Sequence, residues 1–182
     1  MAYSLTWLPD VLRKAGLKVV EIDGWKTRGH GDMGKVFGAM CHHTAECKDD
    51  DLEPALKTIT HGRKGMKGAK DLLGPLANLG LGQDGTWYMI AAGKAWHAGP
   101  GEWQGVTDGN YHFLGIEAEN DGIGEVWPEV QADSFARGCA IIAKYCGFGS
   151  QMVVGHKEWA PKRKIDPNFD MAVFRKRVKG YL

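Results

Sequence analysis

The sequence has few of the features that mark secreted or membrane proteins. It contains only four cysteines in 182 residues, too few for a disulfide scaffold at this length. No apolar run approaches the length of a membrane span, and the first residues, MAYSLTW, lack the basic and apolar regions of a secretory signal. We therefore expect synthesis in a cytoplasm, no membrane insertion and reduced cysteines, although Cys41 and Cys47 could form a disulfide in an oxidising compartment.

A strong charge of either sign is also absent. The formal net charge is +1, which argues against nucleic acid as a partner. The distribution is uneven, however, because residues 157–182 carry eight Lys or Arg and three acids. This basic last quarter could hold the protein near an anionic polymer such as a cell wall. For Arg175, Lys176, Arg177 and Lys179, a solvated helix face is the simpler interpretation.

Length and composition predict one domain over residues 1–182, with a substantial core and no repeats. Apolar periodicity predicts strands at Leu17–Ile22, Val36–Cys41, Leu114–Glu119 and Met152–Val154, and helices at Trp7–Ala15, Asp51–Thr60, Pro128–Cys146 and Met171–Tyr181. An Asp84-Gly85 turn between two apolar runs predicts a hairpin of Ala77–Leu81 with Trp87–Ala92. This alternation indicates an α/β fold with a mixed central sheet flanked by helices and a site at one edge of the sheet.

Candidate metal ligands follow two of the expected strands. His156 comes after a short apolar run, Asp166 follows a loop rich in proline and basic residues, and His42 follows the strand Val36–Cys41. Two imidazoles and one carboxylate suit a catalytic zinc, which takes three protein ligands and keeps a fourth position open. Cys41 and Cys47 do not have the CxxC spacing of a closed structural site.

Two further charged residues fit the chemistry of a hydrolase. Glu117 lies on an apolar strand, where burial would raise the pKa of its carboxyl and favour a role as general base. Lys164 stands two residues before Asp166 and is a candidate to stabilise an oxyanion. The alternatives are an exposed glutamate on an edge strand and a surface lysine.

Several short motifs occur in one order along the chain: HHTA at 42–45, DGT at 84–86, WHAG at 96–99, GIEAEN at 115–120, GH at 155–156 and KIDP at 164–167. In this arrangement, over roughly residues 23–174, the chain resembles the zinc-dependent N-acetylmuramoyl-L-alanine amidases of type 2. That family includes phage endolysins, bacterial wall and recycling amidases, and peptidoglycan recognition proteins. The segment GWKTRGHG at 24–31 looks most like amidase domains from phages of actinobacteria.

The resemblance implies a ligand set and roles for its neighbours. It implies one zinc held by His42, the first histidine of the HHTA pair, with His156 and Asp166. Glu117 matches the catalytic glutamate of the GIE motif, and the strand residues 75–81 contain no tyrosine that could replace it. Lys164 matches the catalytic lysine of the family. His97 matches a loop residue that contacts substrate or supports the site.

The predicted groove for sugar and peptide involves residues in glycine-rich loops. The candidates for substrate binding are Trp25, Arg28, Asn78, Trp96 and His97, with Trp103 as a further groove residue. Packing within the loops is the alternative for the tryptophans. We expect the loops Gly24–Gly34, His61–Lys70 and Gly93–Asn110 to border the groove, and the helix Pro128–Cys146 to lie behind the sheet.

The implied reaction is hydrolysis of the amide between N-acetylmuramic acid and L-alanine in peptidoglycan. The implied protein is a monomeric phage endolysin or its catalytic domain, made in the host cytoplasm without a signal peptide and acting on the bacterial cell wall. No separate wall-binding domain is expected within the sequence, and whether the chain is part of a larger endolysin stays open. The alternatives are a peptidoglycan-binding module without catalysis and a protein with a purely structural zinc.

Overall fold

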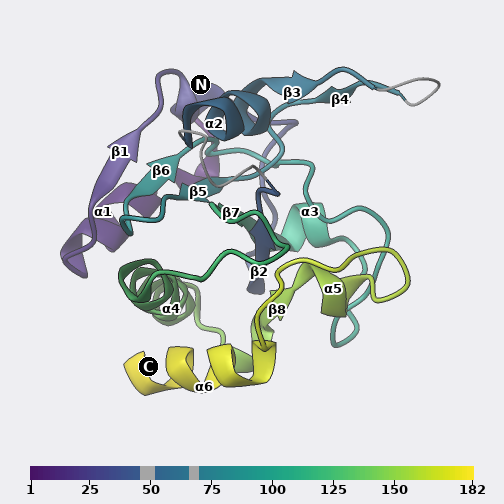
Figure 1. Ribbon diagram of the computed structural model, residues 1–182. Helices are drawn as coiled ribbons and strands as arrows, with labels where there is room; N and C mark the ends of the chain where they lie inside the picture. The colour runs from purple at the N-terminus through teal and green to yellow at the C-terminus, as the bar shows by residue number, and fades with distance from the viewer. Residues whose placement is uncertain (46–51, 66–69) are drawn as a thin grey trace.

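A six-stranded mixed sheet forms the centre of the protein. The computed structural model describes residues 1–45, 52–65 and 70–182. The strands are β1 (Val19–Glu21), β2 (Gly38–His43), β5 (Leu79–Leu81), β6 (Trp87–Met89), β7 (Phe113–Ala118) and β8 (Val153–Gly155), in the order β1-β6-β5-β7-β2-β8. The neighbours β5 and β6 are antiparallel and every other pair is parallel (Figure 1). The predicted α/β fold with a mixed central sheet is therefore confirmed.

Helices cover both faces of this sheet. The helices α1 (Leu8–Lys14), α4 (Glu129–Cys146) and α6 (Met171–Tyr181) pack on one face, where their apolar residues join those of the sheet in the main core. The helix α2 (Leu52–His61) packs on the other face, against Ile90 and Tyr88. The short helices α3 (Gly109–His112) and α5 (His156–Trp159) lie beside β7 and β8, and Trp159 of α5 packs on Met40 and Val154.

The alternation of side chains along β2 and β7 separates the core from the site. Cys41 and Ile116 belong to the core beneath α4. Because successive strand residues point to opposite faces, His42 and Glu117 point away from that helix. The predicted position of the long helix, behind the sheet, is confirmed.

Most predicted elements are present, with shifted ends. The hairpin of β5 and β6 and the helices α4 and α6 are confirmed. The strand expected at Val36–Cys41 begins instead at Gly38 and includes both His42 and His43. The expected strand over Leu114–Glu119 ends at Ala118, so Glu119 follows the strand. The Glu119 carboxylate accepts a hydrogen bond from the backbone amide of Gln83 (2.9 Å).

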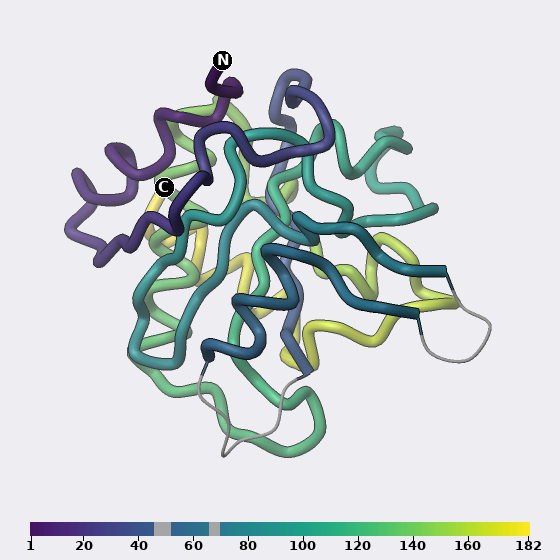
Figure 2. Tube along the Cα trace, turned by 90° about the horizontal axis from the view of Figure 1, so that it is seen from above, coloured from purple at the N-terminus to yellow at the C-terminus, as the bar shows by residue number. Residues whose placement is uncertain are grey.

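The segment expected to be one basic loop, His61–Lys70, contains a strand. Here β3 (Gly62–Arg63) pairs antiparallel with β4 (Leu72–Leu73), and the pair extends away from the body of the molecule in both views (Figures 1 and 2). Residues 66–69 of that loop, as well as Cys47, lie outside the described residues. Among the described residues, no helix combines the length and the apolar character needed to cross a membrane.

Candidate metal centre

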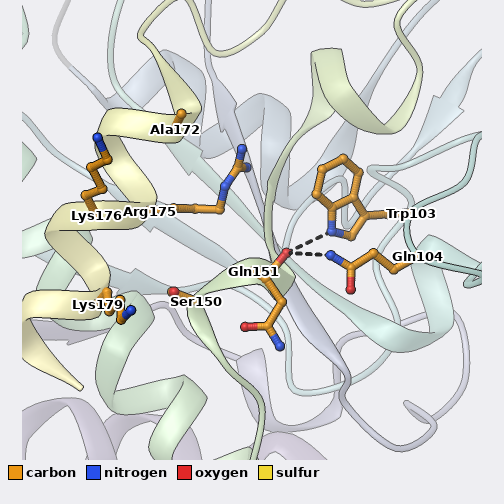
Figure 3. Close-up of a pocket in the computed structure, with 8 residues that line it drawn as sticks. All are labelled: Trp103, Gln104, Ser150, Gln151, Ala172, Arg175, Lys176 and Lys179. Atoms are coloured by element: carbon orange, nitrogen blue, oxygen red, sulfur yellow. Dashed lines mark hydrogen bonds between the residues drawn. The ribbon is translucent and has the colours of Figure 1, made fainter.

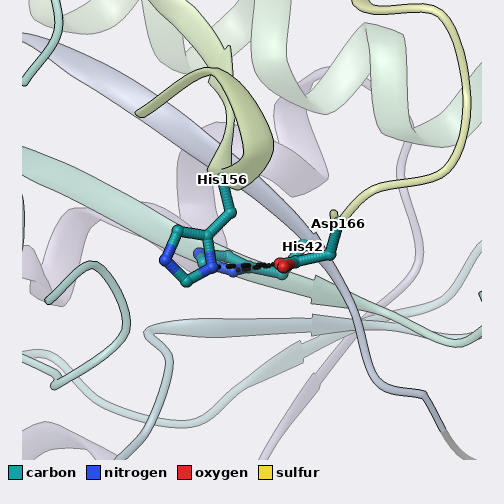
Figure 4. Close-up of side chains that lie close together, drawn as sticks. All are labelled: His42, His156 and Asp166. Carbon is teal, nitrogen blue, oxygen red and sulfur yellow. Dashed lines mark hydrogen bonds and ion pairs between the residues drawn. The ribbon is translucent and has the colours of Figure 1, made fainter. Parts of the chain in front are cut away.

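Three elements bring His42, His156 and Asp166 together. His42 lies near the carboxyl end of β2, and His156 begins α5 directly after β8. Because β2 and β8 are parallel neighbours, their carboxyl ends meet at one edge of the sheet. The following loop returns to this edge, where the Lys157 amide donates a hydrogen bond of 2.6 Å to the Asp166 carbonyl. Figure 4 shows the three side chains pointing toward one another.

The spacing of the three side chains suits a single metal ion. Asp166 Oδ2 lies 3.0 Å from Nδ1 of His42 and 3.0 Å from Nδ1 of His156. One ligand atom from each residue lies within 4.8 Å of the others. Ligand atoms held about 2.1 Å from a tetrahedral zinc would lie about 3.4 Å apart. Both imidazoles are buried, and the Asp166 side chain is mostly buried. The donor set and its spacing therefore fit zinc.

Hydrogen bonds behind the histidines fix which nitrogen of each ring faces the cluster. His156 Nε2 lies 2.9 Å from the Ala98 carbonyl, and His97 Nε2 lies 3.1 Å from the Phe113 carbonyl. Because a carbonyl only accepts, each of these Nε2 atoms carries a proton. The Nδ1 of His97 is then an acceptor for Nε2–H of His42, at 3.2 Å. Both ligand histidines consequently present the lone pair of Nδ1 to the metal position.

Burial and hydrogen bonding set the protonation of the ligands. Burial lowers the pKa of His42 to about 4, and the neighbouring His156 acts in the same direction. Burial opposes ionisation of Asp166, but the contacts of its Oδ2 with the rings of His156 and His42 outweigh this effect and hold the pKa of Asp166 well below its usual range. At neutral pH His42 is therefore neutral and Asp166 is ionised, which are the states that bind a metal.

Glu117 is a carboxyl group beside this cluster. It pairs in register with His42 across β7 and β2, and its Oε1 lies 3.9 Å from His42 Nδ1. Its side chain is 18% exposed, and Oε2 is buried without a hydrogen-bond partner among the described residues. Burial, and then the charge of Asp166, raise the pKa of Glu117 to about 8, against the opposing effect of the nearby Lys164. A carboxyl tuned in this way can exchange protons near neutral pH.

Lys164 and His43 flank the cluster in different ways. Lys164 is partly exposed, and its positive charge lowers the pKa of both His42 and Glu117, which places it at the rim of the site. His43 is buried, and no described residue forms a hydrogen bond with its Nδ1. Its ring lies against Gly122, where an added Cβ would come within 2.2 Å of His43 Cε1. His43 is therefore outside the ligand cluster.

The support for His97 comes from residues that the sequence interpretation did not single out. Asn110 Oδ1 accepts hydrogen bonds from the backbone amides of His97 (2.9 Å) and Ala98 (2.8 Å). The His97 ring lies directly over Gly115, where an added Cβ would come within 2.5 Å of His97 Cγ. The glycine in the GIE motif was a visible signal for this contact, whereas nothing in the sequence pattern pointed to Asn110.

Replacing Gly115 with alanine is expected to weaken zinc binding. The new methyl group would displace the His97 ring and with it the hydrogen bond that orients His42. Loss of such a supporting contact typically costs about 10–100-fold in metal affinity. Competition titration with a chromogenic chelator measures the effect.

Gly124 provides the matched control for this substitution. A Cβ at Gly124 would meet no atom of the described residues within 4 Å. Gly124→Ala should therefore bind zinc as the unchanged protein does. Equal zinc affinity of the two variants would show that the contact of His97 with Gly115 does not matter.

Of the proposed substrate-binding residues, Trp96 is the most accessible. It is 43% exposed, and its ring stacks on His30 with centroids 3.6 Å apart and planes inclined by 7°. Arg28 is partly buried, and its guanidinium donates hydrogen bonds to the carbonyls of Ile90 and Asp23. Trp96 therefore has a free surface for a ligand, while Arg28 joins segments of the scaffold.

The other three residues of that set lie inside the protein. Trp25 is 3% exposed and donates from Nε1 to Glu21 (2.8 Å). Asn78 is fully buried and bonds the backbone on both sides, donating to the Gly93 carbonyl (2.9 Å) and accepting from the Gly115 amide (3.0 Å). His97 is buried behind His42. These three residues contact other parts of the protein rather than solvent, and their role in substrate binding stays a prediction.

The fold and the site define the class: a mixed α/β protein with three candidate metal ligands at the edge of its sheet. The model of the N-acetylmuramoyl-L-alanine amidase family Amidase_2 matches residues 32–169. The chain therefore belongs to this family.

Individual relatives agree with this membership. The chain is 30% identical over 168 residues to the N-acetylmuramoyl-L-alanine amidase AmiD of Escherichia coli (strain K12), an alignment that covers 82% of this chain and 56% of AmiD. It is 34% identical over 97 residues to the 1,6-anhydro-N-acetylmuramyl-L-alanine amidase AmpD of Haemophilus influenzae, covering 52% of each chain. The chain thus spans about half the length of these curated relatives.

Solved structures show the same fold. A complex of E. coli AmiD superposes with a TM-score of 0.61 at 22% identity, covering 87% of this chain and 65% of AmiD. The catalytic domain of XlyA superposes with a TM-score of 0.63 at 16% identity, covering 89% of this chain and 99% of that domain.

Proposed function

We propose that this protein is a zinc amidohydrolase that cleaves the amide between N-acetylmuramic acid and L-alanine of peptidoglycan stem peptides. Family membership supports the reaction class. The E. coli AmiD structure is a complex with anhydro-N-acetylmuramic acid-L-Ala-D-gamma-Glu-L-Lys, which contains this bond. The observation that carries the proposal is the buried Glu117 carboxyl, with one oxygen unpartnered, beside a cluster of three metal ligands.

The residues of the site divide the reaction between them. A zinc ion held by His42, His156 and Asp166 would lower the pKa of a water molecule, so that this water can lose a proton and act as a nucleophile at neutral pH. The ion would also polarise the scissile carbonyl. Glu117 takes a proton from the attacking water and returns it to the leaving nitrogen of L-alanine. The ammonium group of Lys164 stabilises the negative charge that develops on the carbonyl oxygen.

Two non-catalytic alternatives are less consistent with this site. A recognition module without catalysis does not require a metal ligand set together with a carboxyl of raised pKa, and both are present here. A structural zinc site is usually closed by four protein ligands. Among the residues that the structure describes, the cluster consists of three.

The proposal includes a biological role as a phage endolysin, acting as a monomer on the bacterial cell wall. The resemblance of residues 24–31 to phage amidase domains supports it. Adding the zinc-loaded protein to permeabilised actinobacterial cells should lower their turbidity. Unchanged turbidity, from a protein that cleaves soluble muropeptides, would contradict the lytic role and leave the amidase activity intact.

Mass spectrometry of a muropeptide digest tests the reaction itself. The zinc-loaded protein should convert a purified muropeptide into an intact stem peptide with a free N-terminal L-alanine and a saccharide that keeps its lactyl group. A chelator should prevent the conversion, and added zinc should restore it. Cleavage within the peptide or the glycan, or no product from zinc-loaded protein, would contradict the proposal.

A further inference from the structure

A groove separate from the metal centre lies between α6 and the loop that carries Trp103. We call it the α6 groove, and it has a volume of about 310 Å³ (Figure 3). It is lined by Trp103, Gln104, Ser150, Gln151, Ala172, Arg175, Lys176 and Lys179. Three of these residues are cations and none is an acid, so the groove favours an anionic ligand.

The groove and the metal centre lie near opposite ends of β8. Ser150 and Gln151 precede this strand, and the metal ligand His156 follows it. The five residue steps from Gln151 to His156 span at most about 17 Å in extended conformation, at 3.3 Å per residue. The α6 groove is thus outside the metal centre but close enough for one wall fragment to reach both.

The cations of α6 differ in their partners. The Arg175 guanidinium makes a bidentate ion pair with Glu158, at 2.7 and 2.8 Å. Arg177 is paired with acids on α4, including Asp133 at 3.0 Å. Lys176 and Lys179 are exposed, and neither makes an ion pair with a described residue. Two unneutralised ammonium groups therefore remain at the groove.

Trp103 forms a fixed wall of this groove. Its Nε1 donates to the Gln151 carbonyl (2.9 Å), and the Arg175 guanidinium lies 5.6 Å from the ring centroid. Trp103 and Val106 exchange backbone hydrogen bonds of 3.0 Å, which close a tight turn. The indole is therefore held in place before any ligand arrives.

Gln104 in this turn adopts an unfavourable backbone conformation. Its φ is +48°, in the left-handed region that glycine or asparagine normally occupies. Its side chain lines the groove, with Nε2 at 3.5 Å from the Gln151 carbonyl. A non-glycine residue in this region costs about 1–3 kcal/mol, and such strain is concentrated at functional sites.

We propose that the α6 groove binds an acidic glycopolymer of the cell wall. Lys176 and Lys179 would contact its phosphate or carboxylate groups, and the amides of Gln104 and Gln151 would bond its hydroxyl groups. A single-stranded nucleic acid fits less well, because its binding sites usually offer several aromatic rings for successive bases. The α6 groove has one, Trp103.

Binding of labelled polyanions tests this proposal without any need for turnover. The probes are poly(glycerol phosphate), polygalacturonate and single-stranded DNA of similar charge, each measured by fluorescence anisotropy with the zinc-loaded protein. We expect at least one of the two glycopolymers to bind more tightly than the DNA. Which of them binds more tightly identifies the anionic group as phosphate or carboxylate.

A charge-matched pair of variants assigns the binding to the groove. Lys176→Gln combined with Lys179→Gln should weaken glycopolymer binding at least tenfold. Lys14→Gln combined with Lys144→Gln removes the same charge from α1 and α4, at residues that do not line the groove, and should change glycopolymer binding little. Equal loss in the two double variants, or DNA binding as tight as that of both glycopolymers, would overturn the proposal.

Gln104→Gly separates a binding role from a structural one. Glycine relieves the unfavourable φ, so the thermal midpoint should stay unchanged or rise, while glycopolymer binding weakens. Unchanged binding would show that the Gln104 side chain does not contact the ligand. Cleavage of a soluble muropeptide should be the same in all these variants, so failure of this proposal is distinguishable from failure of the proposed amidase activity.

Discussion

Replacing Glu117 with glutamine is expected to reduce turnover by about 10²–10⁴-fold, the usual contribution of a positioned general base. The substitution keeps the size of the side chain but removes its ability to take a proton from water. Since Glu117 lies beside the metal ligands without being one of them, zinc should stay bound. Steady-state kinetics on a soluble muropeptide, with zinc content measured on the same sample, gives both quantities.

Glu119→Gln is the matched control for this experiment. Glu119 lies after β7, where its carboxylate accepts a hydrogen bond from the backbone amide of Gln83. The oxygen of a glutamine can accept the same hydrogen bond, so near-normal turnover is expected. If Glu117→Gln were fully active with zinc bound, or if Glu119→Gln were the inactive variant, the general base would have been assigned to the wrong residue.

Replacing Asp166 with alanine is expected to abolish zinc binding and, with it, activity. Asp166 Oδ2 contacts both Nδ1 atoms, so its removal leaves two imidazoles and no anionic ligand. The loss of affinity should exceed the roughly 10–100-fold that follows loss of a supporting residue. Zinc content after dialysis and activity at saturating zinc measure the effect.

Two further variants distinguish loss of a ligand from loss of structure. Asp166→Cys supplies a thiolate, which is also a zinc ligand, and should recover part of the metal binding. His43→Gln changes the other histidine of the HHTA pair, whose ring packs against Gly122 outside the cluster, and should retain zinc. Retention of zinc by Asp166→Ala, or its loss in His43→Gln, would contradict the ligand assignment.

The sequence predicted the elements around the site because they depend on local patterns. Apolar periodicity identified α4 and α6, and the Asp84-Gly85 turn identified the hairpin of β5 and β6. The two candidate histidine ligands were recognisable from residue type and from their positions after apolar runs. The pairing of β3 with β4 was missed because each strand has only two residues, too few to show a period.

The parts that could not be predicted depend on contacts between distant segments. The proton positions on the ligand histidines follow from backbone carbonyls at Ala98 and Phe113, which no side-chain motif reveals. Burial of Trp25 and Asn78 likewise follows from tertiary packing, which no local sequence pattern reveals. Trp103 was expected near the substrate, yet it contacts α6, more than 60 residues later in the chain.

Anomalous diffraction from crystals grown with zinc identifies the metal ligands themselves. We predict one zinc bound by Nδ1 of His42, Nδ1 of His156 and a carboxylate oxygen of Asp166, at about 2.0–2.2 Å, with the fourth position open to water. Coordination through Nε2, through His43 or Cys41, or by four protein ligands would contradict it, as would the absence of a zinc peak at this edge of the sheet.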